Sequence, residues 1–130
     1  MSSYWYDHIH LISPDPLKTA EFYERMFNAK RVSVTERGAG HVSVALDLNG
    51  SKVLVMNPRV QPETGPSARV DNYGLEHFGI RTDDLETAVA DLKAKGAQFK
   101  EEIREIRPGV KISFLWAPEN VLIELLESND

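Results

Sequence analysis

The chain has 130 residues, of which 42% are hydrophobic and 27% are charged, a balance typical of a folded globular domain and not of a disordered segment. Its net charge of -5 gives no electrostatic reason to expect binding to nucleic acid or to an anionic membrane. The chain contains no cysteine, which excludes disulfides, thiolate metal sites and cysteine nucleophiles.

The start of the chain and its hydropathy pattern favour a cytoplasmic protein. Residues 1–7 lack the basic start and the apolar run of a signal peptide. Nowhere does an apolar stretch approach the length that spans a bilayer, so we expect no membrane association.

The first predicted elements are a strand and a helix. Residues 8–12 alternate polar with large apolar side chains, the period of a half-buried strand. Asp15 before Pro16 is typical of a helix N-cap followed by proline at the first helical position. An apolar stripe at helical spacing continues to Phe27, and Asn28 suits the left-handed position that ends a helix.

Three strands and a linker complete the first half. We expect strands at residues 31–36, 41–48 and 52–57, with Asn49-Gly50 as a tight hairpin turn between the last two. The segment 58–72 is rich in proline and poor in apolar residues, which indicates a linker. A loop of this length also suggests a segment that folds over a functional site.

The second half repeats the first. A histidine lies seven residues before an aspartate in both, at His8 and His77, and a Leu-x-Thr-Ala tetrapeptide follows each aspartate. The second helix is expected to start at Asp83 or Asp84 and to end at Gly96, before strands at residues 98–104, 110–116 and 121–126. Repetition of this order predicts an α+β fold of two tandem β-α-β-β-β modules within one domain, 1–130, with module 1 at 1–57 and module 2 at 73–130.

Strand alternation then predicts a metal site. If Ile9 and Leu11 pack against a helix, His8 and His10 face the other way. The same reasoning places His77, Arg81 and Glu124 on the opposite face from the apolar residues of their strands. Two histidines and one glutamate, His8, His77 and Glu124, would then line a cup formed by the two sheets. Such a set suits one divalent ion, Zn, Mn, Co, Ni or Fe, with coordination positions left for substrate.

The pattern resembles the vicinal oxygen chelate superfamily, which includes glyoxalase I, methylmalonyl-CoA epimerase, extradiol dioxygenases, fosfomycin-resistance transferases and bleomycin-resistance proteins. The similarity covers nearly the whole chain and is carried by residues 7–9, 76–80 and 122–125. It implies that His8, His77 and Glu124 are the metal ligands around a metal-centred cavity.

One position departs from the family pattern. Glyoxalase I and methylmalonyl-CoA epimerase carry a fourth ligand, Glu or Gln, on the last strand of the first half, and the matching residue here is Leu54. Three interpretations remain open. The site has three ligands, or His10 supplies the missing one, or metal binding is weak and the protein is only a binder.

Local similarity at residues 53–58 and 114–118 favours glyoxalase- or epimerase-like chemistry. The resemblance implies an isomerase or lyase that acts on a small carbonyl or thioester substrate through a metal-stabilised enolate. Glu124 is the first candidate for the base, and Glu36 and His41 are candidates for a second base, each with a plain surface role as the alternative. An Fe(II) dioxygenase is the enzymatic alternative, although Phe114 stands where those enzymes carry a tyrosine. The non-enzymatic alternative is a small-molecule binding protein like the bleomycin-resistance proteins.

Four further expectations concern the substrate, the chemistry and the assembly. Arg81 is a candidate to bind a carboxylate or phosphate of the substrate, with a salt bridge to a neighbouring acid as the alternative. Trp116 is a candidate to shape an apolar pocket. His10 is predicted to act as a ligand or a general base, with hydrogen bonding to a neighbouring segment as the structural alternative. Because each half has exposed strand edges, we expect a homodimer.

Overall fold

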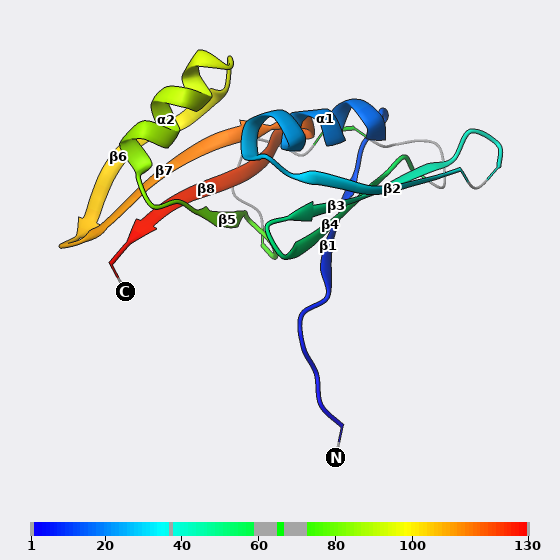
Figure 1. Ribbon diagram of the computed structural model, residues 1–130, viewed down its shortest axis with the longest axis horizontal. Helices are drawn as coiled ribbons and strands as arrows, with labels where there is room; N and C mark the ends of the chain where they lie inside the picture. Colours follow the sequence, from blue (N-terminus) through cyan, green and yellow to red (C-terminus); the bar gives the residue numbers. More distant parts are fainter. Residues whose placement is uncertain (1, 37, 59–64, 67–72, 130) are drawn as a thin grey trace. The chain divides into compact units, whose positions relative to one another are not determined.

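The computed structural model describes residues 2–36, 38–58, 65–66 and 73–129 (Figure 1). The chain divides into two units, unit 1 (Met1–Thr64) and unit 2 (Gly65–Asp130). Their boundary lies inside the segment 58–72 that the sequence predicts as a linker. Most of that segment lies outside the described residues, and so does the expectation that it folds over the site.

Unit 1 consists of one helix and a four-stranded sheet. Its elements in chain order are β1 (His8–Ile12), α1 (Pro16–Phe27), β2 (Lys30–Glu36), β3 (Val42–Leu48) and β4 (Ser51–Met56). The strand order in the sheet is β1-β4-β3-β2. The β1 strand runs parallel to β4, because the helix carries the chain back across the sheet, and the other two pairs are antiparallel.

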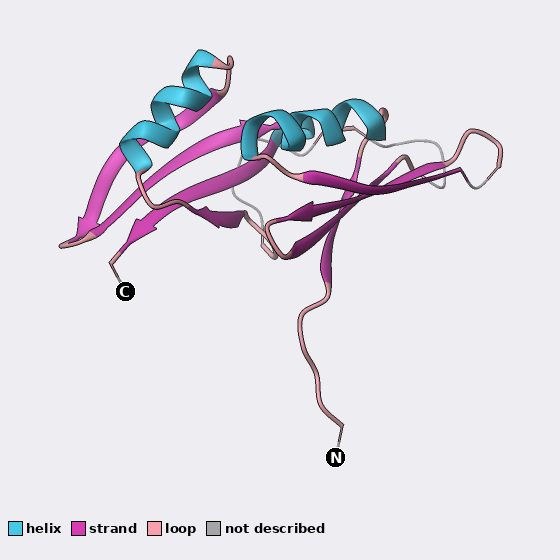
Figure 2. Ribbon diagram, in the orientation of Figure 1, coloured by secondary structure: helices cyan, strands magenta, loops and turns pink. Residues whose placement is uncertain are grey.

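The helix α1 begins and ends as its sequence predicts. The side chain of Asp15 accepts a hydrogen bond from the backbone N–H of Lys18 at 3.2 Å, and Asn28 adopts the left-handed conformation with φ 59°. Figure 2 shows α1 packed against one face of its own sheet. Tyr23 of α1 and Val44 of β3 are both fully enclosed in the core of this unit.

Unit 2 repeats this order with longer strands. Its elements are β5 (Phe78–Arg81), α2 (Leu85–Ala94), β6 (Gln98–Arg107), β7 (Val110–Ala117), the short 3₁₀ helix η1 (Pro118–Asn120) and β8 (Val121–Ser128). The strand order is β5-β8-β7-β6, with β5 parallel to β8. The repeat expected from the two histidines is therefore present element by element.

Two carboxylates secure the start of α2. Asp84 accepts a hydrogen bond from the backbone N–H of Thr87 at 3.1 Å, and this bond holds the pKa of the Asp84 carboxyl below its usual range. Glu127, from the end of β8, accepts a second one from the backbone N–H of Leu85 at 2.8 Å. Both bonds satisfy N–H groups that have no partner inside the helix, and the second ties α2 to its sheet.

The α+β class and the two β-α-β-β-β units are confirmed. The main difference lies in β6, which continues to Arg107, three residues beyond the predicted end, with register shifts along its pairing with β7. As an edge strand it pairs on one side only, so its register tolerates bulges that a central strand would not. Among the described residues, no helix is long and apolar enough to cross a membrane.

Candidate functional site

The sheet face of unit 2 that points away from α2 carries an apolar floor. Alternation along β8 turns Ile123 and Leu125 toward the helix, where both are buried, and turns Glu124 to the opposite face. On that opposite face lies a cluster of Ile112, Phe114 and Leu122, with Trp116 and Leu126 packed against it. We call these five residues the apolar floor. Glu124 lies in the middle of the sheet, paired with Gly79 of β5 and with Phe114 of β7.

His77 and Glu124 come together at one end of this floor. Their Nε2 and Oε1 atoms are 3.7 Å apart, and the two side chains are 29% and 23% exposed. The imidazole of His77 packs edge-to-face on the Phe114 ring, with centroids 5.1 Å apart. Residue 79 on β5 is a glycine, and a Cβ there would be in van der Waals contact with Oε1 of Glu124, at 3.6 Å. The carboxylate therefore rests over a strand with no competing side chain.

This pair of atoms fits two ligands of one divalent ion. Metal–nitrogen and metal–oxygen bonds of about 2.0–2.2 Å allow two ligands of one ion to lie at most roughly 4 Å apart. The observed 3.7 Å satisfies that limit, and it exceeds the length of a direct hydrogen bond. A neutral imidazole nitrogen and a carboxylate oxygen are also donors that Zn, Mn, Co, Ni and Fe accept.

Each predicted histidine ligand is hydrogen-bonded to the acid directly before it. Nδ1 of His77 donates to Oε1 of Glu76 at 2.8 Å, and Nδ1 of His8 donates to Oδ2 of Asp7 at 2.7 Å. Lys52 Nζ lies 3.4 Å from the same Asp7 oxygen. The hydrogen bond from His8, together with the positive charge of Lys52, lowers the pKa of Asp7. Neither acid is among the site residues predicted from the sequence, although an acid directly before each repeated histidine is visible there.

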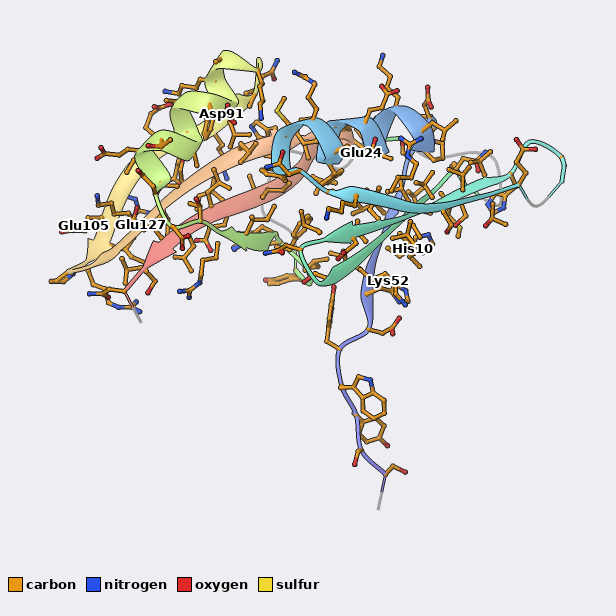
Figure 3. All side chains as sticks on the ribbon, viewed as in Figure 1. His10, Glu24, Lys52, Asp91, Glu105 and Glu127 are labelled. Atoms are coloured by element: carbon orange, nitrogen blue, oxygen red, sulfur yellow. The ribbon has the colours of Figure 1, made fainter. Side chains whose placement is uncertain are left out.

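In unit 1 the face opposite α1 carries His8 and His10. Figure 3 labels His10 on β1 and Lys52 on the neighbouring β4 (Figure 3). The register pairs His8 with Lys52 and His10 with Leu54. His10 is half-buried, and its Nε2 atom is enclosed by protein.

The two registers show which residues are equivalent in the repeat. Glu124 pairs with Gly79, two residues after His77, and Leu54 pairs with His10, two residues after His8. Leu54 therefore occupies in unit 1 the position that Glu124 occupies in unit 2. This agrees with the sequence-based alignment of Leu54 with the missing fourth ligand.

Glu36 and His41 are the two candidates for a second base. Glu36 pairs with Val42, so it shares the face of Val44, which α1 covers, whereas His10 faces the other way. His41 Nε2 donates to the backbone oxygen of Asn57 at 3.1 Å, a bond that holds the imidazole at the end of the sheet. Within unit 1, Glu36 therefore does not share the face of His8 and His10. The catalytic roles of Glu36 and His41 stay predictions.

Arg81 and Trp116 share the face of Glu124. Arg81 is exposed at the end of β5 and pairs with Leu126. It forms no ion pair with any residue in the described part of the chain, so the salt bridge considered as its alternative role is absent there. Trp116 is part of the apolar floor, and Lys100 Nζ lies 5.8 Å from its ring centroid.

The three-ligand set itself stays a prediction. Within the described ranges, no three histidine, aspartate or glutamate side chains gather in a group that could hold a metal ion. His77 and Glu124 belong to unit 2 and His8 belongs to unit 1. The pair within unit 2 is thus the part of the set whose geometry the structure gives.

Comparison with known proteins places these features in context. Residues 5–125 match the family model of the Glyoxalase/Bleomycin resistance protein/Dioxygenase superfamily. Over 127 residues the chain is 30% identical to human mitochondrial methylmalonyl-CoA epimerase, an alignment that covers 92% of this chain and 71% of the epimerase.

Solved structures share the fold. A glyoxalase family protein from Enterococcus faecalis superposes with a TM-score of 0.78 at 19% identity, covering 95% of this chain and 97% of that one. A variant of the fosfomycin resistance protein FosX from Listeria monocytogenes, complexed with Mn(II) and a dihydroxypropylphosphonic acid, superposes with a TM-score of 0.77 at 20% identity. That alignment covers 99% of this chain and 95% of FosX.

Proposed function

Because the chain belongs to the glyoxalase/bleomycin resistance protein/dioxygenase superfamily, we propose that it is a divalent-metal-dependent enzyme. It moves a proton at the carbon next to a carbonyl group of a small anionic substrate, in the manner of a glyoxalase or an epimerase. The observation that carries this proposal is the His77–Glu124 pair, whose 3.7 Å separation fits two ligands of one ion. The similarity to methylmalonyl-CoA epimerase favours a thioester as the carbonyl compound.

The ligands in this proposal are His77 and Glu124, with His8 as the third. When bound, the ion polarises the carbonyl oxygen of the substrate and makes the neighbouring C–H more acidic. The Phe114 ring packs against His77, and Gly79 places no side chain beside the Glu124 carboxylate. Leucine at position 54 has no donor atom, so it contributes no ligand.

We assign proton transfer to Glu124 and His10. A carboxylate at the site of reaction can accept the proton of an acidified C–H, and an imidazole near neutral pH can return it. Glu36 and His41 are weaker candidates, because the first lies on the helix-covered face of its sheet and the second is tied to the Asn57 carbonyl.

The substrate is bound by a cation beside an apolar surface. Arg81 extends from the same sheet face as Glu124 and is unpaired within the described residues, and a guanidinium binds a carboxylate or phosphate by paired hydrogen bonds. The apolar floor beside it offers a surface for an acyl chain. Arg81→Ala is therefore expected to raise KM for an anionic substrate more than it lowers kcat.

Metal analysis tests the first part of the proposal. The purified protein is expected to bind about one Zn, Mn, Co, Ni or Fe ion per chain, and His77→Ala or Glu124→Ala to abolish stoichiometric binding. His41→Ala is the matched control, because its histidine donates to a backbone carbonyl outside the proposed set. A wild-type chain that binds no metal, or full metal content in the His8, His77 and Glu124 variants, would refute the site.

Isotope exchange tests the chemistry. With methylmalonyl-CoA or a glutathione hemithioacetal in D₂O, the metal-loaded protein is expected to wash deuterium into the carbon next to the carbonyl. Oxygen consumption with catechols, without such exchange, would instead support the Fe(II) dioxygenase. The Phe114 side chain, which has no hydroxyl, sits against His77 and argues against that outcome. Tight ligand binding without metal and without turnover would indicate a binding protein.

A further inference from the structure

We propose that Asp7 and Glu76 are positioning residues that fix the tautomers of His8 and His77. Each carboxylate accepts the Nδ1 proton of the histidine that follows it, at 2.7 Å and 2.8 Å. The ring nitrogen that carries no proton is then Nε2, the atom of His77 that faces Glu124. The inference rests on the proposed function only where it names a metal ion as the partner of Nε2.

The contacts depend on where the two acids stand in the chain. Successive side chains of a regular strand point to opposite faces, so neighbouring residues within a strand do not touch. Asp7 precedes β1, which begins at His8, and Glu76 and His77 both precede β5, which begins at Phe78. The extended pleat is not yet established there, and the acid side chain can turn back to its histidine.

The chemistry of the acceptor decides the tautomer. An ionised carboxylate only accepts hydrogen bonds, so a neutral imidazole that contacts it through Nδ1 must carry its proton on Nδ1. Histidine ligands of metal ions commonly donate their second nitrogen to a carboxylate, which orients the ring and raises the basicity of the ligating nitrogen. Here the carboxylate–imidazole part of that arrangement is present at both histidines.

Two independent copies of the contact support a role beyond a chance surface pair. The two units share the same acid–histidine order and the same ring nitrogen, although one acid is an aspartate and the other a glutamate. In unit 1 the acid is also held from the neighbouring strand, because Lys52 on β4 contacts the Asp7 oxygen that accepts from His8.

The chain contains an internal reference for the opposite tautomer. His41 donates from Nε2 to the carbonyl oxygen of Asn57 at 3.1 Å, so its neutral ring carries the proton on Nε2. Long-range ¹H–¹⁵N spectra of the full chain, recorded without metal at a pH where the imidazoles are neutral, distinguish the two forms. We expect Nδ1–H signals for His8 and His77 and an Nε2–H signal for His41.

Substitution of the acids makes this measurement specific. In Asp7→Ala, only His8 is expected to lose its fixed Nδ1–H form and to populate both tautomers. In Glu76→Ala, only His77 is expected to do so. His41 keeps its signals in both variants. Both acids are exposed, so the variants are expected to fold, and circular dichroism checks this. Nε2–H signals for His8 and His77 in the wild-type chain would overturn the inference.

Metal titration provides the second readout. In titrations of the metal-free chain with Zn²⁺ or Mn²⁺, each alanine variant is expected to bind roughly 10- to 100-fold more weakly than wild type. Asp7→Asn and Glu76→Gln keep an acceptor oxygen and are expected to lose less. Asp83→Ala removes an exposed carboxylate that no histidine precedes or follows, and controls for charge. Equal losses in the amide and alanine variants would show a charge effect alone and refute positioning.

The two proposals fail in different ways. A wild-type chain that shows the expected tautomers but binds no metal would refute the proposed function and leave the positioning contacts intact. A wild-type chain that binds metal, with unchanged affinity and unchanged tautomers in Asp7→Ala and Glu76→Ala, would refute the positioning role alone.

Discussion

The side chain of Tyr23 buries a hydroxyl group that has no hydrogen-bond partner among the described residues. The residue is 1% exposed. A buried polar group without a partner costs about 1–3 kcal/mol. We therefore expect Tyr23→Phe to leave the free energy of unfolding unchanged or to raise it by about 1 kcal/mol, measured by urea denaturation.

The contrasting variant is Ser113→Ala. The Ser113 hydroxyl is buried and donates to the backbone oxygen of Glu101 at 2.7 Å. Its loss is expected to cost about 1 kcal/mol. A Tyr23→Phe variant destabilised as much as Ser113→Ala would show that the tyrosine hydroxyl has a partner in solution.

Burial also gives Tyr23 a pH signature. Because desolvation disfavours the phenolate, it raises the pKa of Tyr23 above the usual value of about 10. A raised folded-state pKa contributes stability below the unfolded pKa and loses it as pH rises. The difference in unfolding free energy between wild type and Tyr23→Phe should therefore be constant from pH 7 to 9 and shift against wild type above about pH 10. No change in that difference at pH 10.5 would contradict the burial.

Leu54 offers a gain-of-function test of the repeat. Its position in unit 1 matches that of Glu124 in unit 2. Leu54→Glu is expected to destabilise the metal-free chain, because it places a charge in a half-buried position, and to tighten metal binding about tenfold by adding a charged ligand. Leu54→Met keeps an apolar side chain and serves as the control in both measurements. Weaker metal binding by the glutamate variant than by the methionine variant would count against the equivalence.

At the scale of elements, the hairpin between β6 and β7 depends on Gly109. Its φ of 81° lies in the left-handed region, and a Cβ there would overlap the side chain of Asn129. Gly109→Ala should cost about 1–3 kcal/mol of unfolding free energy. The same substitution in an Asn129→Ala background removes the overlap and should cost only the backbone strain. Gly96→Ala, with φ 90° and open space, is the control for strain alone. Equal costs in both backgrounds would show that the overlap is irrelevant.

Much of the element scale follows from local sequence. Asp15, Asn28 and Asp84 cap helices where their residue types predict caps, because a side-chain oxygen or a left-handed backbone solves a local hydrogen-bonding problem. Asn49-Gly50 forms its turn with both φ values positive for the same reason. These features depend on neighbours within a few residues, so the chain alone is enough to predict them.

The other features of the fold and of the candidate site depend on contacts between residues that are distant in the sequence or on side-chain conformations, and the sequence does not reveal these. The extent of β6 depends on irregular pairing with β7, and a run of charged residues carries no alternation from which to read it. The face of Glu36 follows from its pairing with Val42, past a bulge near Ser33 that breaks simple counting along β2. The pairing of Asp7 with His8 depends on a side-chain rotamer outside the strand. The face of a side chain on a regular strand can therefore be predicted from the sequence, whereas contacts at strand ends cannot.

At the scale of the whole molecule, each sheet ends in two strands that have no partner on their outer edge among the described residues: β1 and β2 in unit 1, β5 and β6 in unit 2. Exposed edges favour association with another strand, and symmetric pairing of two copies satisfies them. We propose a homodimer, for which light scattering behind size exclusion should give about twice the chain mass of 14.7 kDa. A monomer at micromolar concentration would contradict it.

In the proposed metal site, the leucine at position 54 would also set the net charge. Two neutral histidines and one carboxylate would leave a divalent ion with one net positive charge, whereas a second carboxylate at that position would cancel it. An uncancelled charge attracts an anion and repels a cation, and Arg81 adds to the same preference. In the proposed site, leucine at the position equivalent to Glu124 leaves this charge uncancelled. We therefore predict selectivity by sign: neutral analogues of an acidic substrate should compete poorly for this protein.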